Sequence, residues 1–360
     1  MIPVCEPLIT EEDISMALEC LRSGWISSSG SFIDDFEAKW AQYCNMPYGI
    51  AVSNGTVALQ LAVRLLNLQE GDEVIMPTFT IISCAQALIY NGLKPVLVDM
   101  HPLNWQMDVT QIEQKITEKT KAIMIVHIYG HPADMDGILE IANRHNLLVL
   151  EDAAEAHGAE YKGKKCGSLA DVSTFSFYAN KLITTGEGGM VLVRDEALAE
   201  RAKGLRNLCF HKGRRFLHED LGYNFRLTNL QASIALKQIE RISEIIQRKR
   251  SIAKRYNELL QGLPLQLPVE EEWAKSVYWV YGIVVEESTG LTADDVMYRL
   301  KQRGIETRPF FLGMHMQPCF KKLAMFEGEC YPVAERLSRQ GLYLPNGLGI
   351  KDEEIKYICA

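Results

Sequence analysis

The segment STFSFYANKLITTGEGGMVLV, residues 173–193, joins two strand-like apolar runs through a loop that holds one lysine and three glycines. Lys181 follows a stretch rich in phenylalanine and tyrosine and precedes Leu182 and Ile183. Apolar surroundings disfavour an ammonium ion, so the pKa of such a lysine falls and its amine becomes nucleophilic. Most lysines are simply solvated, but this one has the surroundings that Schiff-base chemistry requires.

The chain before this segment alternates short β-branched runs with stretches of helical spacing. The strand-like runs span residues 49–53, 72–77, 94–99, 121–127 and 147–152, and the helical stretches span 56–67, 80–90 and 134–145. This alternation predicts βαβ units, with parallel strands covered by helices on both faces. Runs 171–178 and 188–194 follow each other without a clear helix. We therefore expect a mostly parallel sheet with one antiparallel member.

The pattern changes after residue 227. Residues 228–263 lack glycine and proline until their end and predict one long helix, either straight or bent, which Gly262 and Pro264 terminate. A strand over 278–287 and helices over 292–304 and 333–341 follow, and two helices over 11–23 and 31–44 precede the sheet. We expect a large domain over residues 1–240 and a small α+β domain over 241–360.

Polar residues at strand ends are the first place to search for a site, since ligands of α/β sheets bind beyond the carboxyl ends of the strands. Asn54, Gly55 and Thr56 follow the first strand and open a helix, whose free N–H groups could hold a phosphate. The simpler alternative is a helix cap with a turn glycine. Asp152 ends a later strand, where it could bind a metal, act as a base, pair with a cationic ring nitrogen, or cap a turn.

The combination of these features matches one cofactor, pyridoxal phosphate (PLP). PLP needs an anion site, a carboxylate that keeps its pyridine nitrogen protonated, and a lysine that binds it covalently. Residues 54–56, Asp152 and Lys181 supply these three parts, and the hydroxyl of Ser176 could add a bond to the phosphate. His157 is a further hydrogen-bonding group, for which a packing role is the simpler expectation.

Composition excludes several other classes of protein. The 360 residues carry a formal charge of −8, which argues against nucleic-acid and anionic-membrane binding. Nine scattered cysteines form no CxxC pair, so we expect buried, reduced thiols in a cytoplasmic protein and no metal site. The N-terminus lacks the pattern of a signal peptide, and no run of residues is long and apolar enough to predict a membrane span.

Three segments carry a resemblance to a known family: residues 51–62, residues 151–191, and GYNFRLTNLQA at 222–232. They resemble the DegT family of nucleotide-sugar aminotransferases, and the likeness runs from about residue 2 to residue 358. It implies the aspartate-aminotransferase fold (PLP fold type I), an α/β architecture in which a mostly parallel seven-stranded sheet lies between helices beside a smaller α+β domain. It also implies a homodimer with shared active sites.

The resemblance assigns roles to particular residues. Lys181 would bind PLP and move protons, and Asp152 would pair with the pyridine nitrogen. The other implied cofactor-binding residues are Asn54, Gly55, Thr56, Ile81, Glu155, Ser176 and, reaching the neighbouring subunit, Asn224. Trp25, Ser27, Arg308 and His315 match segments around the sugar-nucleotide site, although Trp25 and His315 suit packing roles equally well.

Two positions depart from the family pattern. Glu155 stands where glutamine is common, and its charge disfavours a nearby phenolate unless a proton is shared. Ile81 stands where an aromatic residue usually stacks on the pyridine ring, so the stacking contribution is lost while water can still be excluded.

The implied reaction moves the amino group of L-glutamate to a nucleotide-linked 4-keto-6-deoxy sugar, with GDP-4-keto-6-deoxy-D-mannose as the expected acceptor. A UDP- or dTDP-linked sugar, a keto sugar acid, and amination at carbon 3 remain open alternatives. Dehydratases of the same family carry histidine in place of the lysine, and Lys181 argues against that branch. A PLP-binding regulator is the non-enzymatic alternative, but the acidic chain shows no basic arm.

Overall fold

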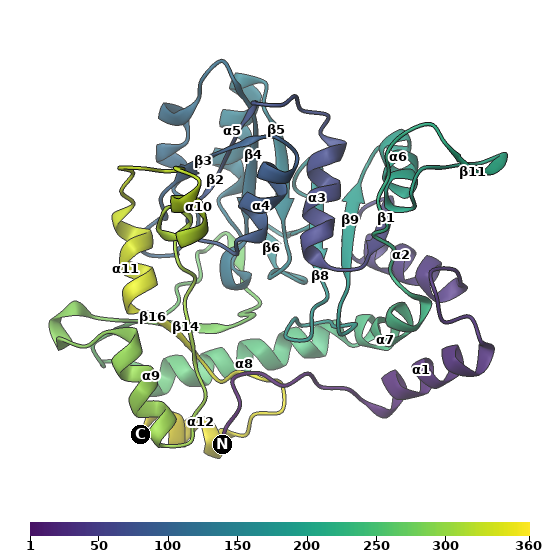
Figure 1. Ribbon diagram of the computed structural model, residues 1–360. Coiled ribbons are helices and arrows are strands. Elements are labelled where there is room, and N and C mark those ends of the chain that lie inside the picture. Colours follow the sequence, from purple (N-terminus) through teal and green to yellow (C-terminus); the bar gives the residue numbers. More distant parts are fainter.

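The computed structural model describes the backbone of residues 1–360 and every side chain except that of Arg215. Its central element is a seven-stranded sheet that lies between helices (Figure 1). The strands of this sheet are β1 (Tyr48–Val52), β2 (Glu73–Pro77), β3 (Lys94–Val98), β4 (Thr120–Val126), β5 (Leu148–Asp152), β8 (Val172–Ser176) and β9 (Gly189–Val193). The fold class predicted from the sequence is therefore confirmed.

The strand order is β1-β9-β8-β5-β4-β2-β3. Strand β9 runs antiparallel to both of its neighbours, and the remaining pairs are parallel. The predicted antiparallel member is thus β9. Because β4, β5 and β8 are parallel neighbours, their carboxyl ends lie together, and the loop that contains Lys181 leaves from the end of β8.

The residues described contain twelve α-helices. They are α1 (Glu11–Ser23), α2 (Ser31–Tyr43), α3 (Gly55–Leu65), α4 (Ser83–Tyr90), α5 (Met135–His145), α6 (Glu196–Arg206), α7 (Asn229–Glu240), α8 (Ile242–Leu260), α9 (Ala293–Gln302), α10 (Pro318–Lys322), α11 (Pro332–Gln340) and α12 (Asp352–Cys359). Helix α3 buries Ala58, Leu61 and Ala62 completely, and this small-residue face packs closely over β8 and β9. That packing places the N-terminus of α3 beside the end of β8.

The helix predicted over 228–263, for which a bend was allowed, is divided in two. Two helices, α7 and α8, meet at Arg241, whose φ of −100° and ψ of 7° interrupt the helical backbone. The guanidinium of Arg241 bonds both carboxylate oxygens of the buried Asp13 in α1, at 2.9 and 2.7 Å. The break therefore lies where a tertiary ion pair holds the chain.

The C-terminal part has its own apolar cluster, in which the rings of Tyr256 and Tyr281 stack with centroids 4.6 Å apart. A four-stranded sheet in the order β12-β14-β16-β15 supports it. Its strands are β12 (Leu265–Gln266), β14 (Tyr281–Val285), β15 (Arg308–Pro309) and β16 (Gly341–Leu344). The N-terminal arm joins this part through a bridge between Ile2 and Ile305. Residue 240, where we expect the two domains to divide, lies at the end of α7, and the division stays a prediction.

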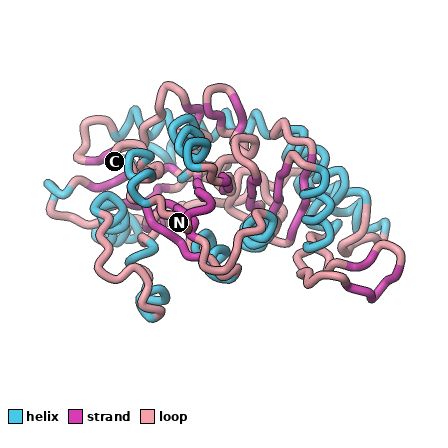
Figure 2. Tube along the Cα trace, turned by 90° about the horizontal axis from the view of Figure 1, so that it is seen from above, coloured by secondary structure: helices cyan, strands magenta, loops and turns pink.

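The remaining strands form two small sheets that the sequence patterns did not predict. One contains β6 (Glu160–Tyr161), β7 (Lys164–Lys165) and β13 (Ala274–Lys275), and the other is a hairpin of β10 (Phe210–His211) and β11 (Arg214–His218). The hairpin projects from one end of the molecule in both views (Figures 1 and 2). Among the residues described, no helix is both long and apolar enough to cross a membrane.

Candidate active site

Lys181 lies in the turn that follows β8, where three hydrogen bonds define the backbone. Its N–H donates to the Tyr178 carbonyl at 2.9 Å, and the carbonyl of Asn180 accepts the indole N–H of Trp279 at 2.8 Å. Farther along the loop, the N–H of Thr185 donates to the Phe177 carbonyl at 2.9 Å. The amino nitrogen of Lys181 lies 3.5 Å from the centre of the Trp279 ring, so the indole face covers it.

The surroundings of Lys181 favour a neutral amine. Burial lowers the pKa of Lys181, and the negative charges of Glu155 and Asp152 oppose this shift. A lowered pKa raises the fraction of free amine near neutral pH, which is the nucleophilic form. The structure thus places Lys181 in a buried position, and its role as the reactive lysine stays a prediction.

Asp152 is 2% exposed at the end of β5. Its Oδ1 accepts the N–H of Ala154 at 3.0 Å, and its Oδ2 accepts the thiol of Cys84 at 3.2 Å. Burial raises the pKa of Asp152, and these two donors together with the Lys181 charge oppose the increase. A buried carboxylate with two fixed donors is oriented before any ligand arrives, as pairing with a cationic ring nitrogen requires.

Glu155 lies in the same enclosure and is 5% exposed. Its Oε2 accepts the N–H of Tyr129 at 2.7 Å. Burial raises the pKa of Glu155 to about 7, against the lowering effects of the Lys181 charge and the Tyr129 N–H. Burial thus favours the protonated carboxyl at this position, and the proton sharing expected from the sequence stays a prediction.

The predicted phosphate site lies at the N-terminus of α3. The side chain of Asn54 caps the helix by accepting the N–H of Val57 at 3.0 Å, while the Thr56 and Ser83 hydroxyls share a bond of 2.9 Å. A Cβ added to Gly55 would lie 2.6 Å from the Cβ of Ser176. The absence of a side chain at Gly55 thus keeps a cradle open between the helix start and the Ser176 hydroxyl. These groups fit the phosphate of PLP.

His157 joins the two sides of this site. Its Nε2 donates to the carbonyl of Ser176 at 2.9 Å, and its Nδ1 accepts the N–H of Ile183 at 3.3 Å. Burial and the Lys181 charge lower the pKa of His157 to about 3, so the ring is neutral. The histidine has the packing role expected from the sequence, and it fixes Ser176 relative to the Lys181 loop.

A cavity of about 290 Å³ lies next to this enclosure, between the Lys181 loop and the C-terminal sheet. Arg308 and Tyr343 line it on one side, and Tyr178, Asn180 and Trp279 line it on the other. The guanidinium of Arg308 is half exposed and pairs with Glu306 at 2.5 Å. Arg308 thus lines the same cavity as Asn180, the residue before Lys181, and its role in binding a substrate stays a prediction.

The structure brings other predicted residues to the surface. Ile81 is 42% exposed at the start of α4, and Trp25 is 64% exposed after α1, where Ser27 is also exposed. Asn224 is exposed, while its neighbour Phe225 accepts the N–H of Ser53 at 2.8 Å and so holds this segment beside the end of β1. The roles of these residues stay predictions.

His315 is buried, and both of its ring nitrogens have partners. Nδ1 shares a bond of 2.9 Å with the hydroxyl of Thr78, and Nε2 lies 3.2 Å from the carboxylate of Glu335. These contacts support the packing alternative for His315, because they leave neither nitrogen for a substrate in this arrangement.

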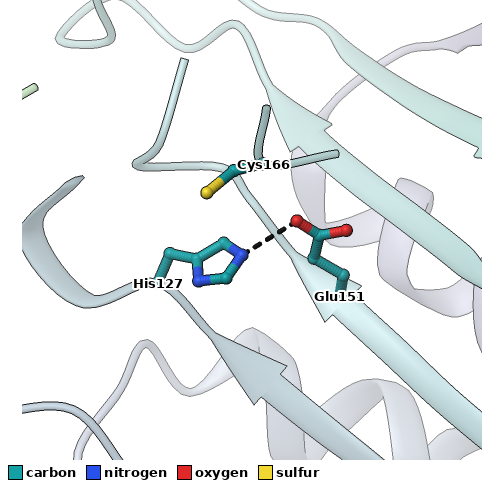
Figure 3. Close-up of side chains that lie close together, drawn as sticks. All are labelled: His127, Glu151 and Cys166. Carbon is teal, nitrogen blue, oxygen red and sulfur yellow. Dashed lines mark hydrogen bonds and ion pairs between the residues drawn. The ribbon is translucent and has the colours of Figure 1, made fainter. Parts of the chain in front are cut away.

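His127, Glu151 and Cys166 form a second buried cluster (Figure 3). Their potential ligand atoms all lie within 4.8 Å of one another. However, Glu151 accepts bonds from His127, Ser173 and the N–H groups of two residues of the 167–169 loop, and the second ring nitrogen of His127 accepts the N–H of Ala133. A metal would have to displace these bonds. Through them, Glu151 of β5 connects His127, which follows β4, to Ser173 of β8.

A larger hollow, of about 580 Å³, lies between α6 and the β10–β11 hairpin. Its lining includes Lys203, Arg206, His211, Lys212 and Arg226, which make it basic. Neither Lys181 nor Asp152 lines it, so this hollow suits an anion and not the carbonyl chemistry of the lysine.

Sequence reasoning missed three residues of the site: Trp279, Tyr129 and Cys84. Trp279 and Tyr129 come from segments far from Lys181 in the chain, and no local pattern links them to it. Cys84 comes after the end of β2, at the same edge of the sheet as Asp152. Its place in the sequence could therefore have predicted that it lies near the site.

The chain matches known proteins over nearly its whole length. Residues 7–360 match the model of the DegT/DnrJ/EryC1/StrS aminotransferase family. The chain is 43% identical to the GDP-perosamine synthase of Escherichia coli O157:H7, with 99% of this chain and 96% of that protein covered. The GDP-perosamine synthase of Vibrio cholerae is 39% identical, with 100% and 97% covered.

A solved structure has the same fold. The Streptomyces venezuelae protein DesV, in complex with a ketimine intermediate, superimposes with a TM-score of 0.90 and 35% identity, covering 97% of this chain and 92% of that one. The chain is therefore a sugar aminotransferase and belongs to the DegT/DnrJ/EryC1/StrS aminotransferase family.

Proposed function

We propose that this protein binds PLP and transfers the amino group of L-glutamate to GDP-4-keto-6-deoxy-D-mannose, giving GDP-perosamine. One observation carries the proposal: a buried amine, a fixed carboxylate and an open anion cradle lie together in one enclosure. The amine belongs to Lys181, the carboxylate to Asp152, and the cradle lies between Gly55 and Ser176. When bound, PLP supplies an electron sink that stabilises negative charge on the carbon that loses its proton.

The residues of the chain have separate tasks in this proposal. Lys181 binds the cofactor through its amine and afterwards carries a proton to and from the substrate carbon, which its lowered pKa permits. Asp152 holds a positive charge on the ring nitrogen. The start of α3 and the Ser176 hydroxyl hold the phosphate, and His157 keeps Ser176 in place. Trp279 excludes water from the amine.

Two observations support a GDP-linked sugar as the acceptor. The relatives with 43% and 39% identity over nearly the whole chain are both GDP-perosamine synthases. In addition, the 290 Å³ cavity beside Lys181 presents the Arg308 guanidinium, which suits a diphosphate or the carboxylate of glutamate. L-Glutamate and the nucleotide sugar would enter this cavity in turn.

A homodimer with shared sites belongs to the same proposal. Ile14, Leu18 and Leu21 of α1, with Trp25 after it, recur at helical spacing and are each 41–64% exposed. An exposed apolar stripe of this kind suits a protein partner, and a second copy of the chain would cover it. Asn224, exposed beside the anion cradle, would then reach the partner subunit's phosphate site.

The function is tested by incubating purified protein with PLP, ¹⁵N-labelled L-glutamate and each candidate ketosugar, followed by mass spectrometry of the sugar product. We expect ¹⁵N in GDP-perosamine, and no product from the Lys181→Ala variant. Amination of a UDP- or dTDP-linked sugar in preference to the GDP-linked sugar would refute the substrate, and full turnover by Lys181→Ala would refute the mechanism.

The shared site is tested by mixing two inactive variants. Subunits with Lys181→Ala and subunits with Asn224→Ala should regain part of the activity when mixed, because a mixed dimer contains one intact site. A mixture that stays inactive, while size-exclusion chromatography shows mixed dimers, would count against Asn224 crossing the interface.

A further inference from the structure

Cys84 contacts the carboxylate that the proposed function pairs with the cofactor ring. It is the second residue of α4, fully buried, and its sulfur lies 3.2 Å from Oδ2 of Asp152. The sulfur also lies 3.6 Å from the hydroxyl of Thr80, which is 2% exposed. Because a carboxylate only accepts hydrogen bonds, the thiol must be the donor to Asp152, and Thr80 can then donate to the sulfur.

The surroundings keep Cys84 a thiol. Burial raises the pKa of Cys84 well above its ordinary value, and the negative charge of Asp152 raises it further. A thiolate beside Asp152 would place two negative charges in contact inside the protein. The S–H group is therefore a permanent donor at neutral pH, and a cysteine here is not a nucleophile.

The start of α4 touches the site at two places. Ser83 bonds the hydroxyl of Thr56 at the anion cradle, and the next residue, Cys84, bonds Asp152. A single helical turn thus links the group that would hold the phosphate to the group that would hold the ring nitrogen. Helix α4 thus fixes the distance between the anion cradle and Asp152. A cofactor that binds the cradle with its phosphate and Asp152 with its ring nitrogen requires a fixed distance between them.

We propose that Cys84 is a positioning residue of this aminotransferase: its thiol fixes the rotamer of Asp152 and stabilises the ionised carboxylate that the ring nitrogen requires. The inference rests on the proposed function for its consequence in catalysis. The hydrogen bond itself belongs to the chain alone and can be measured without cofactor.

The first test is infrared spectroscopy of the apoprotein. The S–H stretching band shifts to lower frequency when the thiol donates, and the difference between wild type and Cys84→Ala isolates this one thiol among the nine cysteines. We expect a low-frequency Cys84 band that moves up in Asp152→Leu and, by a smaller step, in Asp152→Asn. A band at the position of a free thiol in the wild type would overturn the proposal.

The second test separates donation from packing. Cys84→Ser keeps a donor of similar size, and Cys84→Ala removes it. Cys44→Ala is the matched control, because Cys44 is also fully buried but lies at the end of α2, away from Asp152. Titration of apoprotein with PLP, followed by absorbance, should give a dissociation constant about tenfold higher for Cys84→Ala, as expected for a lost bond to a charged group. Cys84→Ser and Cys44→Ala should stay near the wild-type value.

The pH dependence of the same titration adds a signature that packing would not produce. Without its donor, Asp152 holds its proton to higher pH, so the acid limit of PLP binding should move up by about one pH unit in Cys84→Ala. Equal losses in Cys84→Ser and Cys84→Ala, or an unchanged acid limit, would overturn the proposal. If wild-type protein bound no PLP, the proposed function would fail, and the infrared result would still decide the Cys84–Asp152 bond.

Discussion

Glu155→Gln is the substitution from which the electrostatics of the site can be measured most directly. Glutamine keeps the size of the side chain and can still accept the Tyr129 N–H that Glu155 accepts at 2.7 Å. It removes the ionisation of a carboxyl whose pKa burial raises from 4.5 to about 7. A difference of that size between folded and unfolded states corresponds to about 3 kcal/mol of free energy of unfolding.

The sign follows from proton counting. Between pH 4.5 and 7 the folded protein keeps the Glu155 proton that the unfolded chain has already released, so the Glu155 contribution to stability falls as pH rises through this window. Below pH 4.5 the carboxyl is protonated in both states, so its ionisation does not lower the free energy of unfolding. Above pH 7 it is ionised in both states, and the free energy of unfolding is lower by the full amount. Asp152 and Lys181 face the same carboxyl, and the Lys181 charge reduces the penalty while that of Asp152 adds to it.

Urea unfolding of the apoprotein at several pH values between 5 and 8 would measure this effect. We expect Glu155→Gln to be more stable than wild type by about 1 kcal/mol at pH 5 and by about 3 kcal/mol at pH 8. Parallel stability curves for the two proteins over this range would refute the reasoning, since they would mean that Glu155 ionises as freely in the folded state as in the unfolded chain.

Three further substitutions test other parts of the structure. Gly55→Ala should raise the dissociation constant for PLP at least tenfold in an absorbance titration, because the added Cβ would lie 2.6 Å from the Cβ of Ser176; unchanged binding would mean that the cradle is elsewhere. Trp40→Ala should cost about 3–5 kcal/mol in urea unfolding, because the ring is fully buried against Phe175, Phe177 and His157, and a loss below about 1 kcal/mol would contradict that packing. Burial lowers the pKa of Lys249 to about 8, so the folded protein releases this proton at a lower pH than the unfolded chain does. The free energy of unfolding of the wild type should therefore rise between about pH 8 and 10, and Lys249→Met should remove this rise. A rise that persists in the variant would mean that another group causes it.

The sequence was enough to predict the sheet and the core of the site because both depend on local patterns. Apolar runs alternating with helical spacing predicted a mostly parallel sheet with one antiparallel member, which the structure identifies as β9, and the apolar neighbours of Lys181 made it the candidate lysine. The residues of the 54–56 turn and Asp152 follow strand ends, where parallel topology brings side chains together.

What the sequence could not predict depends on contacts between distant segments. The break between α7 and α8 occurs where Arg241 bonds Asp13, more than two hundred residues away in the chain, and helical periodicity carries no sign of it. The indole of Trp279 covers Lys181 only because the C-terminal part packs on the loop after β8. His315 is a similar case, because its two partners, Thr78 and Glu335, become neighbours only in the folded chain.

Lys181 is the residue that we propose binds PLP. Reduction of the PLP-loaded protein with borohydride fixes the cofactor to its lysine, and mass spectrometry of the peptides then identifies that residue. The buried Lys249, whose pKa burial also lowers, is the natural internal control, because it donates to the Trp279 and Asn346 carbonyls instead of lining an anion site. We predict that the modified peptide contains Lys181. Modification of Lys249 or of another lysine, with Lys181 unmodified, would contradict the account.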